Sequence, residues 1–124
     1  MTEFEKRPAG VLFKGEQIKK LIQENPDLPV CFLANEEANI GDYNTMFCTS
    51  CYAEIGEILD CMQEINDEIV FTDRDMFEEC VSDNLSYNDD WAEASDAAFD
   101  AEVKRIIAEY EPYWKKCILI TVGN

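Results

Sequence analysis

The residues best suited to chemistry are the six cysteines, three of which lie in the stretch MFCTSCYAEIGEILDC at residues 46–61. Cys48, Cys51 and Cys61 have C-x2-C-x9-C spacing, and thiolates at C-x2-C spacing can hold one metal ion from a turn. A closed structural zinc site needs four ligands, which makes Cys80 the candidate for the fourth. The substitutes for that fourth ligand are Asp60 and Cys31. The spacing therefore predicts a structural zinc ion on Cys48, Cys51, Cys61 and Cys80.

Packing in a strand is the alternative interpretation of the same cysteines. Positions 48 and 51 have opposite parity, so a flat strand points the two side chains to opposite faces of a sheet. Cys48 and Cys51 meet at one ion only if the chain turns or bulges at Thr49-Ser50. Without that turn they pack as small apolar residues.

Catalytic chemistry is disfavoured by what the chain lacks. It contains no histidine, which excludes Ser-His, Cys-His and histidine general-base mechanisms. The C-x2-C pair has no lysine or arginine nearby in the sequence to lower a thiol pKa. Glu36, Glu37 and Asp42 lack the spacing of a calcium-binding loop. The sequence therefore predicts a protein that is not an enzyme.

Charge is the second prominent feature. The net charge is −17, and the segment from Asp27 to Glu102 holds 21 acids and one base, Arg74. Such a segment repels nucleic acid and anionic membranes and attracts a basic protein, for instance one that itself holds nucleic acid. The alternative is that the acidity serves only solubility.

A long helix is expected from about residue 90 to 111, and its acids form part of the predicted contact surface. Asp89, Glu93, Asp96 and Asp100 recur at 0, +4, +7 and +11, which places them on one side of that helix. One charge per helical turn is about one per 5.4 Å, sparser than a DNA strand, so acids of the preceding helix are needed as well. The predicted partner-binding residues are Glu78, Glu79, Asp83, Asp89, Asp90, Glu93, Asp96 and Asp100.

Helices are predicted from hydrophobic periodicity and from residues that start or stop a helix. Residues 15–24 have helical spacing and end at Asn25-Pro26, because the residue before proline disfavours the helical region. A second helix begins at Thr72 or Asp73, either of which can cap it. The apolar residues that it is expected to bury are Met76, Phe77, Cys80, Val81 and Leu85. The apolar face of the long helix is expected to hold Phe99, Val103, Ile106 and Tyr110.

Strands are predicted at five places. The apolar runs at residues 29–34 and 116–122 indicate buried strands, with Cys31 and Cys117 in the core. Residues 45–53 and 55–62 indicate two more, with Gly56 at a turn or a bulge between them. Residues 68–72 follow a turn at Asn66-Asp67. The predicted fold class is α+β, a mainly antiparallel sheet of about four to five strands with helices packed on one face.

Domain organisation follows from length. A chain of 124 residues indicates one domain, here residues 11–124 after a flexible arm at residues 1–10. No apolar run is long enough for a membrane span, and the N-terminus lacks the apolar core of a signal peptide. The expected location is therefore the cytoplasm of a host cell, where disulfides are rare.

Three stretches carry a resemblance to a known class of protein: LPVCFLANEEANIGDYNTMFCTSCYAEIGEILDC, FTDRDMFEE and EYEPYWKKCILITV. The chain resembles small acidic proteins of phages and prophages, among them anti-CRISPR inhibitors of type II effector nucleases, some of which bind zinc. The resemblance implies binding to a type II CRISPR effector nuclease and a block on its nucleic-acid loading. It assigns no individual contact residue.

Overall fold

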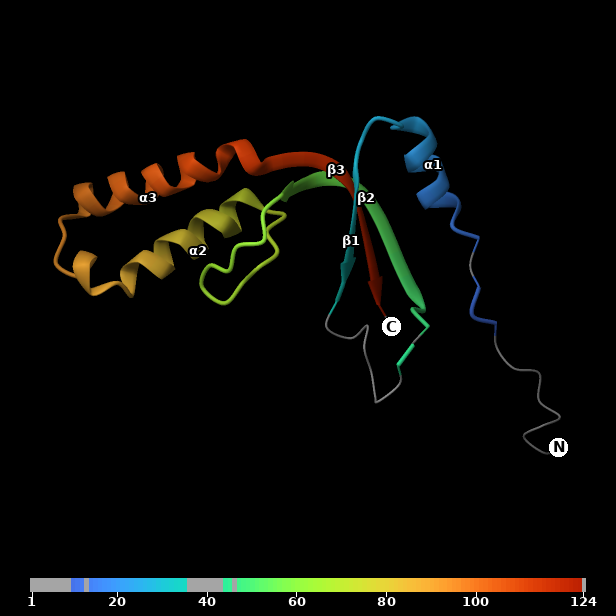
Figure 1. Cartoon of the computed structure of the whole chain (residues 1–124), viewed down its shortest axis with the longest axis horizontal. Coiled ribbons are helices and arrows are strands. Elements are labelled where there is room, and N and C mark those ends of the chain that lie inside the picture. The colour runs from blue at the N-terminus through green and yellow to red at the C-terminus, as the bar shows by residue number, and fades with distance from the viewer. Residues whose placement is uncertain (1–9, 13, 36–43, 46, 124) are drawn as a thin grey trace. The chain divides into compact units, whose positions relative to one another are not determined.

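The computed structural model describes residues 10–12, 14–35, 44–45 and 47–123. These residues form three α-helices and a three-stranded mixed sheet, which confirms the α+β class (Figure 1). The arm expected at residues 1–10 lies outside the described residues except for Gly10. In chain order the elements are α1 (Glu16–Glu24), β1 (Val30–Ala34), β2 (Ser50–Leu59), α2 (Arg74–Ser86), η3 (Asp89–Trp91), α3 (Asp96–Tyr110), η4 (Glu111–Tyr113) and β3 (Trp114–Gly123).

The chain divides into two compact units. One comprises Met1–Glu54 and Ile118–Asn124, and is called the sheet unit here; the other, Ile55–Cys117, is called the helical unit. The boundaries fall inside β2 and β3, so each of these strands contributes residues to both units.

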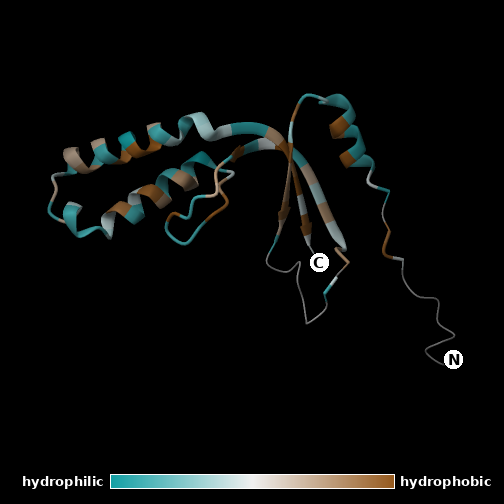
Figure 2. Ribbon diagram, in the orientation of Figure 1, coloured by the Kyte–Doolittle hydropathy of each residue, from teal (hydrophilic) through white to brown (hydrophobic). Residues whose placement is uncertain are grey.

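In the sheet unit, β3 is the central strand. The strand order is β1-β3-β2, and β1 runs parallel to β3 in a register from Val30↔Ile118 to Ala34↔Val122. Ile118 and Ile120 are buried together with Ala53 of β2, and the helix α1 packs Ile18 and Leu21 against them. Figure 2 shows hydrophobic residues concentrated in β1 and in the part of β3 that belongs to this unit. The apolar run at the end of the chain is thus the centre of the sheet, as its composition predicts.

β1 differs from the buried strand that its sequence predicts. None of its five residues is buried, Cys31 is half-buried, and the Phe32 side chain is 74% exposed. The physical reason is position: β1 is at the edge of the sheet, because β3 occupies the centre. An apolar run alone does not distinguish an edge strand from a central one.

Two predicted strand boundaries are wrong. β2 is one strand through Gly56, with no turn there. Residues 68–72 form no strand, although Ile65 and Glu68 make an isolated antiparallel bridge and the Leu59 N–H donates to the Phe71 carbonyl at 2.9 Å. Asn66 and Asp67 form the expected turn, with positive φ angles of 52° and 66°. Among the described residues the sheet therefore has three strands and one parallel pair, instead of four or five mainly antiparallel strands.

In the helical unit, Phe77 is the centre of the core. Its ring is 5.2 Å from that of Phe71, 5.4 Å from Tyr110 and 5.8 Å from Trp114, each in an edge-to-face arrangement. Such contacts add stability beyond the burial of their area. Cys80, Val81 and Leu85 are also buried on α2, as predicted, whereas Met76 is 49% exposed.

Capping residues set both helix starts in this unit. The Asp73 carboxylate accepts from the backbone N–H of Asp75 at 2.9 Å and of Met76 at 3.4 Å, which confirms the predicted start of α2. The Ser95 hydroxyl accepts from the Ala98 N–H at 3.2 Å, so α3 begins at Asp96. The helix expected from residue 90 is therefore wrong in its first turn and a half, where η3 and a turn precede the Ser95 cap. Its apolar face is as predicted, with Val103, Ile106 and Tyr110 packed on the core and Phe99 half-buried.

Candidate functional site

The four predicted zinc ligands lie in two different parts of the fold. Cys48 precedes β2 and Cys51 lies in it, both half-buried and both in the sheet unit. Cys61 and Cys80 belong to the helical unit. Within the described part of the chain, no three Cys, Asp or Glu side chains are grouped so that they could hold a metal ion. Zinc binding thus stays a prediction from spacing. The loop residues Glu36, Glu37 and Asp42 lie outside the described residues.

The environments of Cys51, Cys61 and Cys80 indicate packing. Cys51 packs against the buried cluster of the sheet unit, on the same side of β2 as Ala53. Cys80 is buried in the core of the helical unit, and Cys61 packs against it. Burial raises the pKa of the Cys61 and Cys80 thiols, and neighbouring carboxylates raise it further. Protonated thiols are poor nucleophiles and must lose their protons to bind metal.

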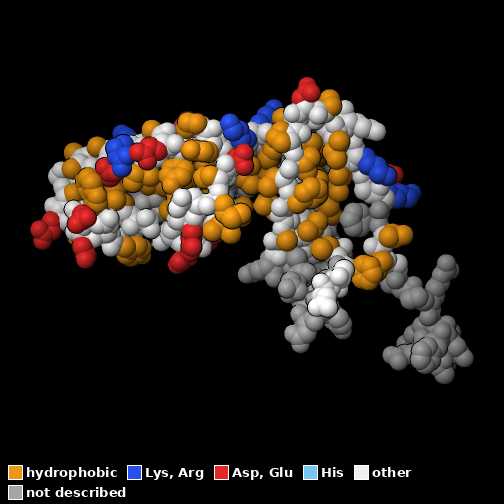
Figure 3. Space-filling model, viewed as in Figure 1, with side chains coloured by type: hydrophobic (Ala, Val, Ile, Leu, Met, Phe, Trp, Pro, Cys, Tyr) orange, Lys and Arg blue, Asp and Glu red, His pale blue; other side chains and the backbone are white. Residues whose placement is uncertain are grey.

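All eight predicted partner-binding acids are exposed. They occupy α2, η3, the turn that follows η3, and the first turns of α3, all within the helical unit. Figure 3 shows acidic side chains on the face of this unit that is in view. The members on α2 are Glu78, Glu79 and Asp83, those on η3 and its turn are Asp89, Asp90 and Glu93, and those on α3 are Asp96 and Asp100.

The single stripe of four acids predicted on a long helix is wrong. Asp89 and Glu93 precede the Ser95 cap, so they do not share a helix with Asp96 and Asp100. The longest regular row lies instead on α2, where Asp75, Glu79 and Asp83 recur at four-residue spacing. Residues four apart are neighbours on a helix, so this row places like charges side by side.

Some of the acids of the helical unit are accounted for by internal contacts. Arg74 pairs with Glu57 at 2.9 Å and with Glu111 at 2.7 Å, and its guanidinium lies 4.8 Å from the centre of the Trp114 ring. Hydrogen bonding to Arg74 lowers the pKa of the Glu57 carboxyl. The one base of the acidic segment is therefore used inside the unit.

A second internal pairing lies on α3. Arg105 pairs with Glu102 and Glu109, which lie one turn away on either side. The contact with Arg105 lowers the pKa of the Glu102 carboxyl. By contrast, no ion pair among the described residues involves any of the eight predicted partner-binding acids. Within the described part of the chain, no ion pair neutralises these eight charges.

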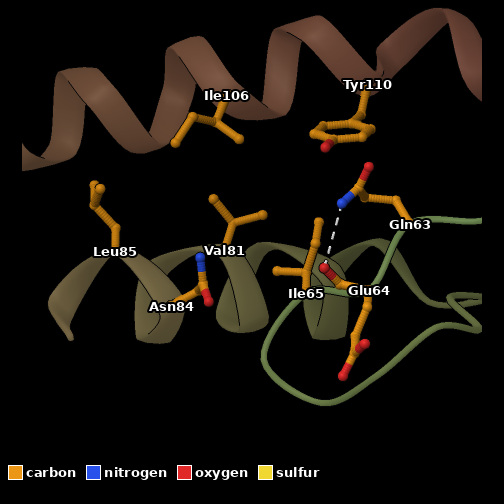
Figure 4. Close-up of a pocket in the computed structure, with 8 residues that line it drawn as sticks. All are labelled: Gln63, Glu64, Ile65, Val81, Asn84, Leu85, Ile106 and Tyr110. Carbon is orange, nitrogen blue, oxygen red and sulfur yellow. Dashed lines mark hydrogen bonds between the residues drawn. The ribbon is translucent and has the colours of Figure 1, made fainter. Parts of the chain in front are cut away.

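A hollow of about 170 Å³ opens between α2, α3 and the chain before the Asn66-Asp67 turn. Val81 and Leu85 point into it from α2, and Ile106 and Tyr110 face them from α3 (Figure 4). The remaining lining residues are Gln63, Glu64, Ile65 and Asn84. Sequence reasoning missed this hollow, because periodicity marks its apolar residues as core and nothing local predicts that residues 63–65 lie beside them.

The charge of the two units differs. The helical unit has 18 acids and five bases, a net charge of −13, whereas the sheet unit has nine acids and five bases, a net charge of −4.

None of the helices in the described ranges has the length and apolar composition of a membrane span. Comparisons of the chain with protein-family models, with curated proteins and with solved structures found no match.

Proposed function

We propose that this protein is a non-enzymatic acidic binding protein, and that its helical unit binds a basic surface of a protein that handles nucleic acid. One observation carries the proposal. A unit with a net charge of −13 presents eight exposed acids that make no ion pair among its described residues. Charge of one sign on one surface attracts an oppositely charged protein and speeds its association.

The first partner to test is a type II CRISPR effector nuclease, which the resemblance implies. Its channel for guide RNA and target DNA is positively charged, so an acidic unit fits it electrostatically. Occupying that channel blocks nucleic-acid loading without any chemical step. The protein is then an anti-CRISPR inhibitor encoded by a phage and acting in the host cytoplasm.

The test uses two triple variants with the same change in charge. Glu79→Gln, Asp83→Asn and Asp90→Asn neutralise exposed acids of the helical unit, and Glu24→Gln, Asp27→Asn and Glu54→Gln neutralise exposed acids of the sheet unit. With a purified effector nuclease, the first triple is expected to lower the association rate about tenfold, and the second by less than about twofold. Binding should also weaken as salt rises, because exposed charges are screened.

Two outcomes would count against the proposal. If both triples bind as tightly as the wild type, the acidity serves only solubility. If no basic nucleic-acid-handling protein binds at low salt, the electrostatic role is wrong altogether. Loss of guide or target binding by the nuclease when the protein is added distinguishes a block on loading from attachment elsewhere.

A structural zinc ion on Cys48, Cys51, Cys61 and Cys80 is a separate proposal. It is tested by metal analysis of protein purified without chelator, with Cys48→Ser and Cys51→Ser as the variants. A stoichiometric ion that both substitutions remove supports the site. A metal-free wild type contradicts it, and leaves the proposed function intact because that function requires no metal.

A further inference from the structure

The side of β1 that faces away from β3, called the open edge here, carries backbone groups that β3 does not use. Within the described part of the sheet, β1 pairs with β3 alone (Figure 1). The Pro29 carbonyl accepts from the Ile118 N–H at 2.9 Å, and the Asn35 N–H donates to the Val122 carbonyl at 3.1 Å. Residues alternate along a strand in the side to which their N–H and C=O groups point. The odd-numbered residues of β1 therefore bond to β3, and the even-numbered residues face the open edge.

The sequence of β1 leaves this edge unprotected. A row of unpaired N–H and C=O groups is a template for another strand, and proteins commonly block it with charged residues or proline. Residues Val30–Ala34 have the sequence VCFLA, which contains neither. β2, the strand at the other edge of the sheet, carries two exposed acids, Glu54 and Glu57. The two edges therefore differ, and β1 is the one suited to pairing.

Phe32 lies at the centre of the open edge. Its neighbour in the register is Ile120 of β3, yet Ile120 is 3% exposed and Phe32 is 74% exposed. Ile18 and Leu21 of α1 pack on the cluster that contains Ile120, so the cover that α1 provides does not extend to Phe32. β1 is hydrophobic along its length (Figure 2). Removing these exposed apolar groups from water is favourable.

A second copy of the chain fits this edge in both register and hydrogen bonding. In an antiparallel pair of β1 strands with the two-fold axis at Phe32, each Phe32 lies opposite Phe32 of the second copy, and Val30 lies opposite Ala34. These residues face outwards on both strands, so each pair exchanges both of its N–H···O bonds. Cys31 lies opposite Leu33, so no pair brings two charges together. The strand is thus self-complementary, as a two-fold interface requires.

The distribution of charge also favours contact between copies at this edge. Each chain has a net charge of −17, so two copies repel each other. The sheet unit has a net charge of −4, and the helical unit one of −13. Contact through an uncharged strand of the sheet unit therefore brings fewer like charges together than contact through the helical unit.

We propose that β1 is a dimer interface, and that two copies join their sheets by antiparallel pairing of their β1 strands about Phe32. The two sheets then form one continuous sheet in which β1 is no longer an edge. One strand pair is a small interface, so the dimer is weak and dissociates on dilution. The proposal does not depend on the proposed function, which uses the acids of the helical unit.

Sedimentation velocity of the full-length protein measures the dimer over a range of protein concentrations. A dimer is expected at the highest concentrations. Raising potassium chloride from about 0.1 M to about 1 M should tighten it at least about twofold, because salt screens the repulsion between copies. This salt dependence is opposite in sign to that expected for binding to a basic protein, so the two kinds of contact are distinguishable.

Two lysine substitutions separate the open edge of β1 from the rest of the surface. Phe32→Lys places like charges directly opposite each other at the two-fold axis and is expected to weaken the dimer about tenfold. Tyr52→Lys makes the same change in charge at an exposed aromatic residue of β2, and should change dimerisation by less than about twofold. Both substitutions lower the net negative charge, so general repulsion alone predicts tighter association for both. Circular dichroism checks that both variants are folded.

Amide hydrogen exchange gives a second measurement that needs no substitution. As the protein concentration rises, exchange should slow at Val30, Phe32 and Ala34, because their N–H groups face the open edge and become bonded in the dimer. Exchange at Cys31 and Leu33 should change less, because their N–H groups already bond to β3. Slowing at alternate residues is the signature of a strand added to this edge.

Three results would overturn the β1 dimer. A protein that stays monomeric at millimolar concentration in high salt has no such interface. Equal effects of Phe32→Lys and Tyr52→Lys, or slower exchange spread evenly over β1, would place the contact elsewhere. If the alternating protection appears only when a nucleic-acid-handling protein is added, a strand of that protein covers the edge in place of a second copy.

Discussion

The helical unit is the more highly charged of the two, and among the described residues it also has the larger buried cluster. Its cluster has seven buried residues, centred on Phe77, whereas the described part of the sheet unit has a cluster of three: Ala53, Ile118 and Ile120. Self-repulsion among acids of one sign destabilises a compact state. The cluster around Phe77 provides apolar burial that opposes this repulsion in the helical unit.

The two units also differ in how charges are used. Every ion pair between described residues lies in the helical unit, and the two arginines there each bridge two carboxylates. Arg74 joins the end of β2, the start of α2 and η4, whereas Arg105 joins only residues of α3. The first links distant elements, and the second reinforces a single helix.

The largest effect is expected from removing the aromatic centre of the helical unit. Phe77→Ala should cost about 3–5 kcal/mol of unfolding free energy, because it leaves a cavity among Phe71, Tyr110 and Trp114. Amide hydrogen exchange should show that protection of the backbone amides is lost mainly in residues 55–117. Phe32→Ala is the control in the sheet unit, where the side chain is 74% exposed, and should change stability by less than about 0.5 kcal/mol. Equal loss of protection in both units would contradict a role for Phe77 that is centred on the helical unit.

A smaller effect is expected from the bridging arginine. Arg74→Met removes both ion pairs and the contact with the Trp114 ring while keeping much of the apolar stem. Because the pairs are exposed, solvent screens them, so the midpoint of urea unfolding should fall by well under half of the Phe77→Ala change. Arg105→Met is the matched control. It should lower the midpoint of urea unfolding by less, because the partners of Arg105 are neighbours on one helix. A larger effect for Arg105→Met would contradict the bridging role.

The pH dependence of stability tests one arm of that bridge. The pKa of the Glu57 carboxyl is lowered in the folded protein. Its ionised form therefore stabilises the folded state at pH values above the ordinary pKa of a glutamate. This stabilisation is lost as the pH falls through the lowered pKa. Wild type should therefore be more stable than Glu57→Gln near neutral pH, and the difference should vanish in acid. Urea unfolding of both proteins across that range measures it, and a difference that persists in acid would assign it to another cause.

The smallest effect is expected from added salt without any substitution. Raising the ionic strength shortens the screening length from about 10 Å at 0.1 M to about 3 Å at 1 M. Each row pair such as Glu79 and Asp83 repels by about 0.2–0.5 kcal/mol, so screening should slow amide exchange more in the helical unit than in the sheet unit. Potassium chloride titrations followed by hydrogen exchange test this. Equal slowing in both units would show that the difference in net charge is not felt as repulsion.

Local signals in the sequence determined much of this protein. The cap at Asp73 gives the start of α2, Asn25-Pro26 marks the end of α1, and Asn66-Asp67 forms the turn. The apolar run at residues 116–122 predicts the strand that becomes the centre of the sheet. These features depend on residues close together in the chain, so they can be predicted without knowing the fold. The concentration of acids in the middle segment is likewise a property of the sequence alone.

Only the tertiary structure decided which distant residues meet. An apolar run is compatible with an edge or a central strand, and the parallel pairing of β1 with β3 places β1 at the edge. The hydrophobic pattern predicts a continuous helix from about residue 90, but Ser95 caps α3 and the helix begins at Asp96. The predicted stripe of four acids is therefore divided. Arg74 found its partners on β2 and η4, and the hollow arose where residues 63–65 meet α2 and α3. Such contacts depend on chain segments far apart in sequence, and local propensity carries no information about them.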